Sequence, residues 1–395
     1  MFQVNSVLQS YDTFNIKTIT NRFIKHRDLV HLLESLKPNP LFSIKEVGKS
    51  FEGRSINLIN LGNGPIKVFL WSQMHGNEPT ATMALMDLLN FLGNNDQNIA
   101  RESILKHCTL YILPMLNPDG TEVFDRRNAQ NIDINRDFHS QQSPESRILR
   151  SLRDEINPEF GFNLHDQTSM WSAGSSGNPA TISLLAPAYD QSLSINEVRL
   201  RAMQVIIEMN ETLQHIIPDH VGRFDDEYEH RAFGDNFQAA GTSTILIEAG
   251  GYADDIEKQY VRKLVFIAIA KGLHSIANQS FINKKRQEYF AIPDNKLHHF
   301  QILLRNCKLN RKGQAYLADI GLIAKERIND DLRSITQTFN IADVGDLSTR
   351  YAYQDIDCRT YTLIETQPLK IDEPADLLLM KDTELLMAIE KGVLR

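Results

Sequence analysis

The sequence predicts an α/β fold with a mixed, mostly parallel sheet, followed by a small, mainly β C-terminal domain. Up to about residue 283, short apolar runs typical of buried strands alternate with longer stretches whose apolar residues recur at helical spacing. After a charged joint at 284–286, the helical stretches stop and short β-rich runs take their place. We therefore expect two domains, residues 1–283 and residues 284–395.

The elements of the first domain follow from apolar periodicity and from turn residues. The helix at 80–92 is the clearest, because its apolar residues recur every three or four positions. Further helices are expected at 17–36, 143–156, 196–217 and 255–276. Strands are expected at 42–47, 56–61, 68–71, 109–114, 161–166, 182–186 and 244–248.

The second domain is expected to be built from strands. Its β-rich runs lie at 300–304, 315–323, 361–364 and 377–380. Roughly a hundred residues is within the usual size of a domain. Neighbouring residues of a strand point to opposite faces, so His298 and His299 cannot readily bind one ion. We expect this domain to pack against the first or to gate its substrate.

Composition and charge exclude several functional classes. Hydrophobic residues make up 42% of the 395 residues, as in ordinary globular proteins, and the net charge of −8 argues against nucleic-acid or anionic-membrane partners. Three widely spaced cysteines form neither a disulfide framework nor a thiolate zinc site. The N-terminus resembles no secretory signal and no run is long enough to span a membrane, so a cytoplasmic protein is expected. The oligomeric state is not indicated.

His75 and Glu78 lie three residues apart at the corner between the strand at 68–71 and the helix at 80–92. Open α/β sheets place ligand sites at such corners. Zinc accepts imidazole nitrogen and carboxylate oxygen, and a catalytic zinc needs three protein ligands and a water. Alternatively, Glu78 is only an acid at the positive end of the helix. The His-x-x-Glu spacing alone does not decide between the two.

Three further polar clusters follow expected strands: the arginine-rich segment 125–138, His165 and Glu248. The carboxyl ends of parallel strands meet at one edge of a sheet, so these clusters can meet His75 and Glu78. Glu248 closes an apolar run and must reach solvent, a partner or a metal, because burying it unpaired is costly. Two histidines, a glutamate ligand and a spare carboxylate are the set that a hydrolytic zinc site needs.

Six segments resemble the zinc carboxypeptidases of the metallocarboxypeptidase A-like (M14) family, in family order and at similar spacing. They are residues 48–54, 75–78, 117–120, 133–138, 164–165 and 246–248. The resemblance covers about the first 280 residues and implies a sheet with helices on both faces. It also implies a metallocarboxypeptidase that binds one Zn²⁺ per chain and hydrolyses a peptide bond to release a C-terminal residue.

The resemblance implies a role for each matching residue near the metal. His75, Glu78 and His165 would bind zinc. Glu248 would be the general base that takes a proton from the attacking water and passes it to the leaving amine.

The resemblance also implies how the substrate is held. An arginine would stabilise the oxyanion; Arg126 fits best, and Arg127 is a competitor that spacing does not separate from it. Asn135 and Arg136 would bind the C-terminal carboxylate, which a planar guanidinium matches bidentately. Tyr228 lies at about the place of the family's mobile tyrosine. The side-chain preference is not readable from the sequence.

Two other interpretations remain open. The first is a small-molecule N-acyl amino acid deacylase of the aspartoacylase and succinylglutamate desuccinylase type. That branch shares the His-x-x-Glu, the Asn-Arg-x-Phe and the later histidine, and it carries a C-terminal β domain. Residues 164–169 could fit that branch, whereas 48–54 and 117–120 resemble the peptidase branch. A binding module that has lost catalysis would lack a ligand or the base, and the sequence retains all of them.

Overall fold

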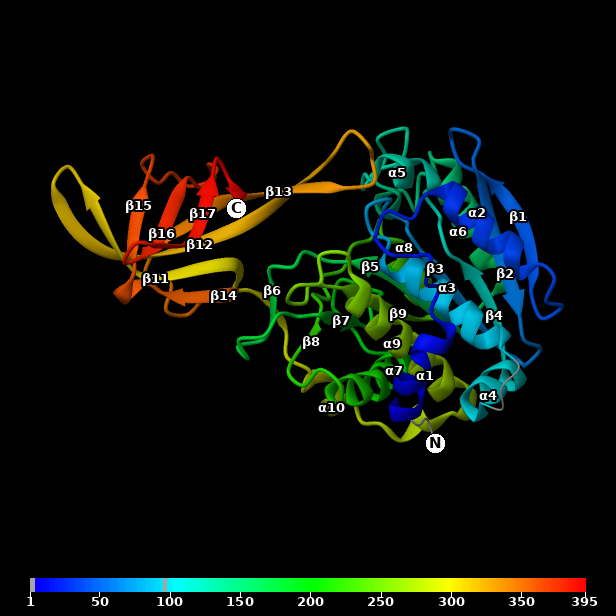
Figure 1. Ribbon diagram of the computed structural model, residues 1–395. Coiled ribbons are helices and arrows are strands. Elements are labelled where there is room, and N and C mark those ends of the chain that lie inside the picture. Colours follow the sequence, from blue (N-terminus) through cyan, green and yellow to red (C-terminus); the bar gives the residue numbers. More distant parts are fainter. Residues whose placement is uncertain (1–3, 95–97) are drawn as a thin grey trace. The chain divides into compact units, whose positions relative to one another are not determined.

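The computed structural model describes residues 4–94 and 98–395 (Figure 1). The chain divides into two compact units. The first comprises the residues up to Thr168 together with Ala180–Asn295, and the second comprises Ser169–Pro179 and Lys296–Arg395. Asn283, where the sequence suggests a boundary, is the last residue of the short 3-10 helix η2 (Ser280–Asn283) in the first unit.

The first unit is built on one eight-stranded sheet with the order β1-β2-β4-β3-β5-β9-β7-β8. Four of its seven neighbouring pairs are parallel, including β4–β3, β3–β5 and β5–β9 at its centre. This confirms the mixed, mostly parallel sheet. The strands are β1 (Ser43–Lys49), β2 (Ser55–Leu61), β3 (Ile66–Ser72), β4 (Cys108–Leu113), β5 (Phe160–Asp166), β7 (Ile182–Leu185), β8 (Val221–Arg223) and β9 (Ser243–Ala249).

Helices cover both faces of the sheet. Alternate residues of a strand point to opposite faces, so a strand that is apolar throughout needs cover on both. Val68 and Leu70 of β3 join one hydrophobic core, whereas Phe69 and Trp71 join another. The first core takes side chains from α1 (Val4–Phe14), α2 (His26–Leu36), α3 (Thr80–Gly93), α4 (Ile99–His107), α7 (Glu197–Gln214) and α9 (Gln259–Asn278). The second takes them from α6 (Pro144–Ile156) and α8 (Phe233–Ala239). The remaining helices are α5 (Pro118–Val123) and α10 (Arg286–Phe290).

The helix expected at 17–36 is shorter than predicted. Helix α2 begins only at His26, where the Asp28 carboxylate accepts a hydrogen bond from the Lys25 backbone N–H at 3.1 Å and caps the helix start. Ile19 and Phe23 are buried, but they lie in an irregular segment. The prediction was therefore wrong about the start of the helix.

The second unit consists mainly of strands in two four-stranded sheets, ordered β13-β12-β11-β14 and β15-β16-β17-β18. Residues of both sheets share one core, including Leu304, Leu322, Leu379 and Ile389. This confirms a mainly β region. The strands of these sheets are β11 (His299–Arg311), β12 (Gln314–Ile328), β13 (Ile335–Gly345), β14 (Tyr351–Asp357), β15 (Thr362–Glu365), β16 (Leu377–Lys381), β17 (Glu384–Glu390) and β18 (Val393–Leu394). The short 3-10 helix η3 (Cys358–Thr360) precedes β15. Strands β6 (Trp171–Ala173) and β10 (Asn295–Leu297) form a separate two-stranded sheet.

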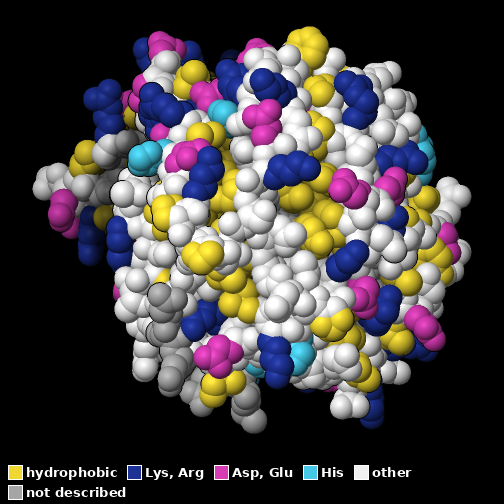
Figure 2. Space-filling model, turned by 90° about the vertical axis from the view of Figure 1, so that its right-hand side faces the viewer, with side chains coloured by type: hydrophobic (Ala, Val, Ile, Leu, Met, Phe, Trp, Pro, Cys, Tyr) yellow, Lys and Arg dark blue, Asp and Glu magenta, His cyan; other side chains and the backbone are white. Residues whose placement is uncertain are grey.

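The visible surface carries charges of both signs, and the cysteines form no disulfide within the described residues. On the face that Figure 2 shows, basic and acidic side chains are interspersed, with small hydrophobic patches between them. All three cysteines are unpaired and buried. Among the described residues, no helix combines the length and the apolar character needed to cross a bilayer.

Candidate metal centre and active site

His75 and Glu78 lie on the turn between β3 and α3, and a glycine between them allows that turn to pack closely. The Glu78 N–H donates to the His75 carbonyl at 3.2 Å, which closes the turn. A Cβ on Gly76 would lie 2.1 Å from the carbonyl carbon of Gly120. Only glycine therefore permits this backbone approach. The His-x-x-Glu turn is pressed against the turn at 117–120.

Asn117 ties these two turns together. Its backbone N–H donates to the Gln73 carbonyl at 2.9 Å, and its side-chain amide donates to the Met74 carbonyl at 3.3 Å. Its side-chain oxygen accepts from the Gly120 N–H at 2.9 Å and caps α5. Asn117 is fully buried, so these bonds are shielded from water. The second family-like motif thus supports the backbone of the first.

The turn at 48–54 supports the motif at 117–120 in the same way. Asp119 accepts from the Ser50 hydroxyl at 2.6 Å, from the Glu52 N–H at 2.9 Å and from the Arg54 guanidinium at 2.7 Å. Three segments far apart in the sequence are therefore joined by hydrogen bonds, which reach the backbone at Gln73 and Met74, just before His75. Their resemblance to one family reflects a single physical unit.

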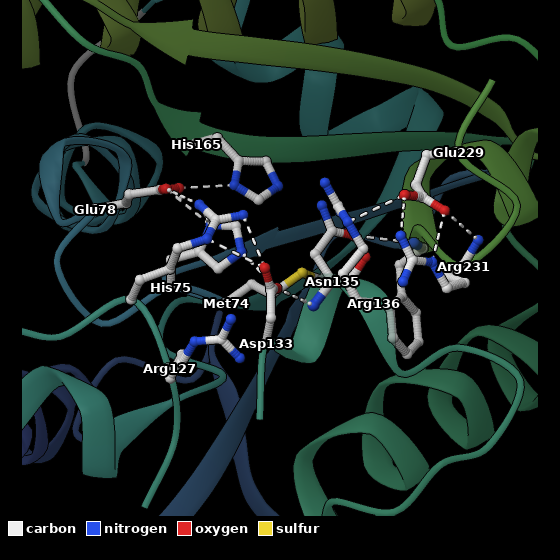
Figure 3. Close-up of polar contacts among 12 residues, drawn as sticks. Met74, His75, Glu78, Arg127, Asp133, Asn135, Arg136, His165, Glu229 and Arg231 are labelled. Carbon is white, nitrogen blue, oxygen red and sulfur yellow. Dashed lines mark hydrogen bonds and ion pairs between the residues drawn. The ribbon is translucent and has the colours of Figure 1, made fainter. Parts of the chain in front are cut away.

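His75, Glu78 and His165 converge at the carboxyl edge of the sheet (Figure 3). Glu78 Oε1 lies 2.8 Å from His75 Nδ1, and Glu78 Oε2 lies 2.7 Å from His165 Nδ1. All three side chains are buried, with residue exposures of 1%, 7% and 3%. Burial opposes ionisation of Glu78, but the two imidazoles outweigh it and hold the pKa of Glu78 well below its usual range.

These residues fit a zinc ion. One ligand atom from each lies within 4.8 Å of the other two. Zinc bonds of about 2.0–2.2 Å in a tetrahedral site place ligand atoms about 3.3 Å apart, so one ion can reach all three donors. Two imidazoles and one carboxylate are a donor set that catalytic zinc accepts.

Asp133 orients His75 and was not predicted as a site residue. Its Oδ1 accepts from His75 Nε2 at 3.1 Å, which leaves the lone pair of Nδ1 for a metal. Burial opposes the charged form of His75, but the Glu78 and Asp133 carboxylates outweigh it and raise the His75 pKa. The only signal in the sequence was the position of Asp133 at the start of the segment 133–138.

The two candidate oxyanion arginines lie in different surroundings. Arg126 donates from Nε to Asp133 Oδ2 at 3.1 Å and from Nη1 to Glu78 Oε1 at 3.2 Å. Arg127 is exposed and donates to the Asn131 carbonyl at 3.0 Å. The fold thus brings Arg126, and not Arg127, to the His–Glu–His cluster.

Glu248 faces the same cluster from β9. It is the register partner of His165 on the adjacent parallel strand. It is 8% exposed, and its Oε2 has no hydrogen-bond partner among residues 4–94 and 98–395. Burial, with the nearby charges of Glu78 and Asp166, raises its pKa well above the usual value. A buried carboxylate whose Oε2 has no partner among the described residues is thus placed beside the three candidate ligands.

Asn135 and Arg136 lie on the 3-10 helix η1 (Ile134–Arg136), which Asp133 caps by accepting from the Asn135 N–H at 3.0 Å. Asn135 Oδ1 accepts from the Phe233 N–H at 3.0 Å, so its acceptor is already used. Arg136 is ion-paired with Glu229 at 3.2 Å. Tyr228, on the adjoining loop, is partly exposed, and its side chain makes no polar contact within the part of the chain that the structure describes.

Comparison with known proteins points to one family. Residues 28–181 match the family model Peptidase_M14, described as zinc carboxypeptidase. Carboxypeptidase 2 of Trichophyton rubrum is 29% identical over 144 residues, which is 34% of this chain and 26% of that protein. Carboxypeptidase SOL1 of Arabidopsis thaliana is 28% identical over 166 residues, 37% of this chain and 34% of that protein. The match thus spans only 26% and 34% of the length of these curated relatives.

Solved structures share the fold. A metallo-carboxypeptidase from Burkholderia cenocepacia has a TM-score of 0.52 at 18% identity and covers 65% of this chain and 69% of its own. The carboxypeptidase A from Helicoverpa armigera has a TM-score of 0.53 at 16% identity and covers 70% of this chain and 81% of its own. Residues 28–181 are thus similar to the zinc carboxypeptidase family, and the chain shares the fold of the solved carboxypeptidases.

Proposed function

We propose that the protein is a zinc-dependent metallocarboxypeptidase that hydrolyses a peptide bond and releases a C-terminal residue. The observation that carries the proposal is the convergence of His75, Glu78 and His165 with the buried Glu248 on the neighbouring strand. One zinc per chain, held by the first three, would act as a Lewis acid and lower the pKa of water towards ~7. The first unit would carry catalysis, and the second would be an accessory domain.

Glu248 is the proposed proton carrier. Its raised pKa and its unpaired Oε2 suit a base that takes a proton from the attacking water and then gives it to the leaving amine. Arg126 is the proposed donor to the developing oxyanion. Its guanidinium already lies at the ligand cluster, where a fixed positive charge stabilises negative charge that develops during the reaction.

Arg136 is the proposed site for the substrate's terminal carboxylate, with Asn135 beside it. The side chain of Arg136 is 37% exposed, so an incoming peptide can reach it. A guanidinium binds a carboxylate bidentately, which selects a free chain end over an amidated one. Tyr228 is the proposed cover for the bound residue, because it lies in the loop that also contains Glu229.

Comparing matched peptides with free and amidated C-termini tests the proposal. The purified protein should contain about one zinc and should release the last residue of the free peptide, as seen by mass spectrometry. The amidated peptide should be cleaved at least tenfold more slowly, because charge-assisted hydrogen bonds contribute about 1.5–3 kcal/mol each. Equal cleavage of both peptides would contradict the proposal.

The deacylase alternative is tested in the same assay. N-acetylaspartate and succinylglutamate should not be hydrolysed if the peptidase proposal is correct. The peptidase proposal is supported by the turns at 48–54 and 117–120: Asp119 joins them to each other, and Asn117 joins the second to the backbone just before His75. Hydrolysis of either small molecule with no peptide cleavage would favour the deacylase.

A further inference from the structure

The arginine assigned to the substrate's carboxylate already has a carboxylate partner in this chain. Arg136 Nε lies 3.2 Å from Glu229 Oε2. Figure 3 shows Glu229 directed towards both Arg136 and Arg231. Glu229 therefore offers Arg136 the same chemical group that a peptide C-terminus would offer.

A second arginine holds Glu229 more completely. Arg231 donates from Nε to Glu229 Oε1 at 2.9 Å and from Nη2 to Glu229 Oε2 at 2.7 Å, a bidentate pair. These hydrogen bonds, together with the charge of Arg136, lower the pKa of Glu229 to about 2. Glu229 is thus ionised at neutral pH.

This arrangement lets Glu229 leave Arg136 without losing its charge partner. If a substrate carboxylate takes its place, Glu229 keeps both hydrogen bonds to Arg231, so no carboxylate is left unpaired. The pair is also accessible, with side-chain exposures of 37% for Arg136 and 27% for Glu229. Exposed ion pairs are weak and are readily exchanged for another partner.

The backbone of Glu229 is anchored although its side chain is accessible. Its N–H donates to Asp235 Oδ1 at 3.1 Å at the start of α8, and its carbonyl accepts from the Ala232 N–H at 2.8 Å. The carboxylate is therefore presented to Arg136 from a fixed turn. Exchange needs only a movement of side chains.

We propose that Glu229 is a specificity-determining residue that competes with the terminal carboxylate of the substrate for Arg136. This inference rests on the proposed function, in which Arg136 binds a free C-terminus. Substrates must displace Glu229 to bind, so Glu229 raises the KM for peptides with a free carboxylate. It does not act on the chemical step, because in the described structure its carboxylate pairs with Arg136, Arg231 and His230 and not with the proposed metal ligands or Glu248.

The substitution Glu229→Gln tests this inference. The amide keeps the size of the side chain and removes the charge that competes. The KM for a free-carboxylate peptide should fall by about two- to fivefold, the range that measured exposed ion pairs imply. The kcat should stay within twofold, and cleavage of the amidated peptide should not change. Competitive inhibition by 3-phenylpropionate should strengthen by the same factor as the KM falls, whereas inhibition by 3-phenylpropanamide should not change.

Glu227→Gln is the matched control. Glu227 is an exposed acid of the same loop that forms no ion pair with Arg136 in the described structure. The substitution Glu227→Gln removes the same charge as Glu229→Gln and should leave the KM for the free-carboxylate peptide unchanged. Thermal melting of each variant shows whether it is folded. If Glu229→Gln does not fold, Glu229→Asp is the second variant, because its shorter side chain withdraws the carboxylate from Arg136.

The outcomes separate the inference from the proposed function. If the wild type prefers the free peptide but Glu229→Gln has an unchanged or higher KM, the inference is wrong and the proposed function stands. A higher KM would mean that Glu229 positions Arg136. If the wild type cleaves both peptides equally, the proposed function fails and the inference fails with it.

Discussion

His165 on β5 and Glu248 on β9 are register partners across two parallel strands at the centre of the sheet. The proposed metal ligand and the proposed base are therefore held by the same backbone hydrogen-bond ladder. Both strands are buried nearly throughout, so the separation of the two side chains is fixed by the core. Such preorganisation allows one side chain to hold a metal and its neighbour to move protons without rearrangement.

Glu248→Gln should keep the zinc and lose most of the rate. The amide is isosteric but cannot accept a proton, and general acid–base roles typically contribute ~10²–10⁴-fold. Zinc content by atomic absorption and kcat on a free-carboxylate peptide check this. If the variant loses its zinc, Glu248 is a ligand and its assignment as the base is wrong.

His75→Ala and His165→Ala should each remove both zinc and activity. Each deletes one of three protein donors, and a catalytic zinc site needs all three. The control is His215→Ala, because His215 is exposed at the end of α7 and should not affect either quantity. Full zinc and full turnover in either ligand variant would contradict the assignment.

Asp133→Ala should weaken zinc binding by about 10–100-fold, the usual effect of removing the partner of a metal-binding histidine. Asp133 accepts from His75 Nε2 and holds the ring that presents Nδ1. Competition with a chromophoric chelator measures the affinity. Asp125→Ala is the control, since the Asp125 side chain is exposed and, within the described part of the chain, accepts only from the Arg127 N–H of its own loop. An unchanged affinity would mean that Asp133 acts only as the cap of η1.

Much of the site was predictable because its residues follow apolar strands directly. His165 and Glu248 each come at the end of such a run, and strand ends share one edge of the sheet. The contact between Asp133 and His75 was not predictable, because Asp133 lies in a loop and not at the end of a strand. For the same reason, only the folded loop distinguishes Arg126 from Arg127.

Parts of the fold also could not be predicted from local sequence patterns. Helix α4 was not predicted, because its polar residues give only a weak apolar stripe and Asn98 alone marks its start. The segment 169–179 follows a strand of the first unit but belongs to the second. Nothing in its own composition indicates this, because membership of a unit is decided by long-range contacts.

Gly76→Ala should destabilise the protein and weaken zinc binding together. The added Cβ would lie 2.1 Å from the Gly120 backbone, so one of the two turns must move. Overpacking of this kind typically costs about 1–3 kcal/mol. Denaturant unfolding and zinc affinity measure the two effects. Asn77→Ala, an exposed position of the same turn, is the control. A variant that loses stability but keeps its zinc affinity would show that the turn relaxes without moving the ligands.

Asp235→Asn should change how stability depends on pH. Burial, with the charge of Glu229, raises the pKa of Asp235 from 3.8 to about 7, although the Glu229 N–H and Arg136 oppose the shift. Between these two values the folded state holds a proton that the unfolded state has lost. The stability of the wild type should therefore fall as pH rises from about 4 to about 7. The amide of Asp235→Asn keeps an acceptor for the Glu229 N–H and carries no charge. The melting temperature of the variant should therefore equal that of the wild type near pH 4 and exceed it near pH 8. The exposed Asp225→Asn is the control and should show no such divergence. Parallel melting curves of wild type and Asp235→Asn across this range would show that Asp235 is ionised in the folded protein throughout.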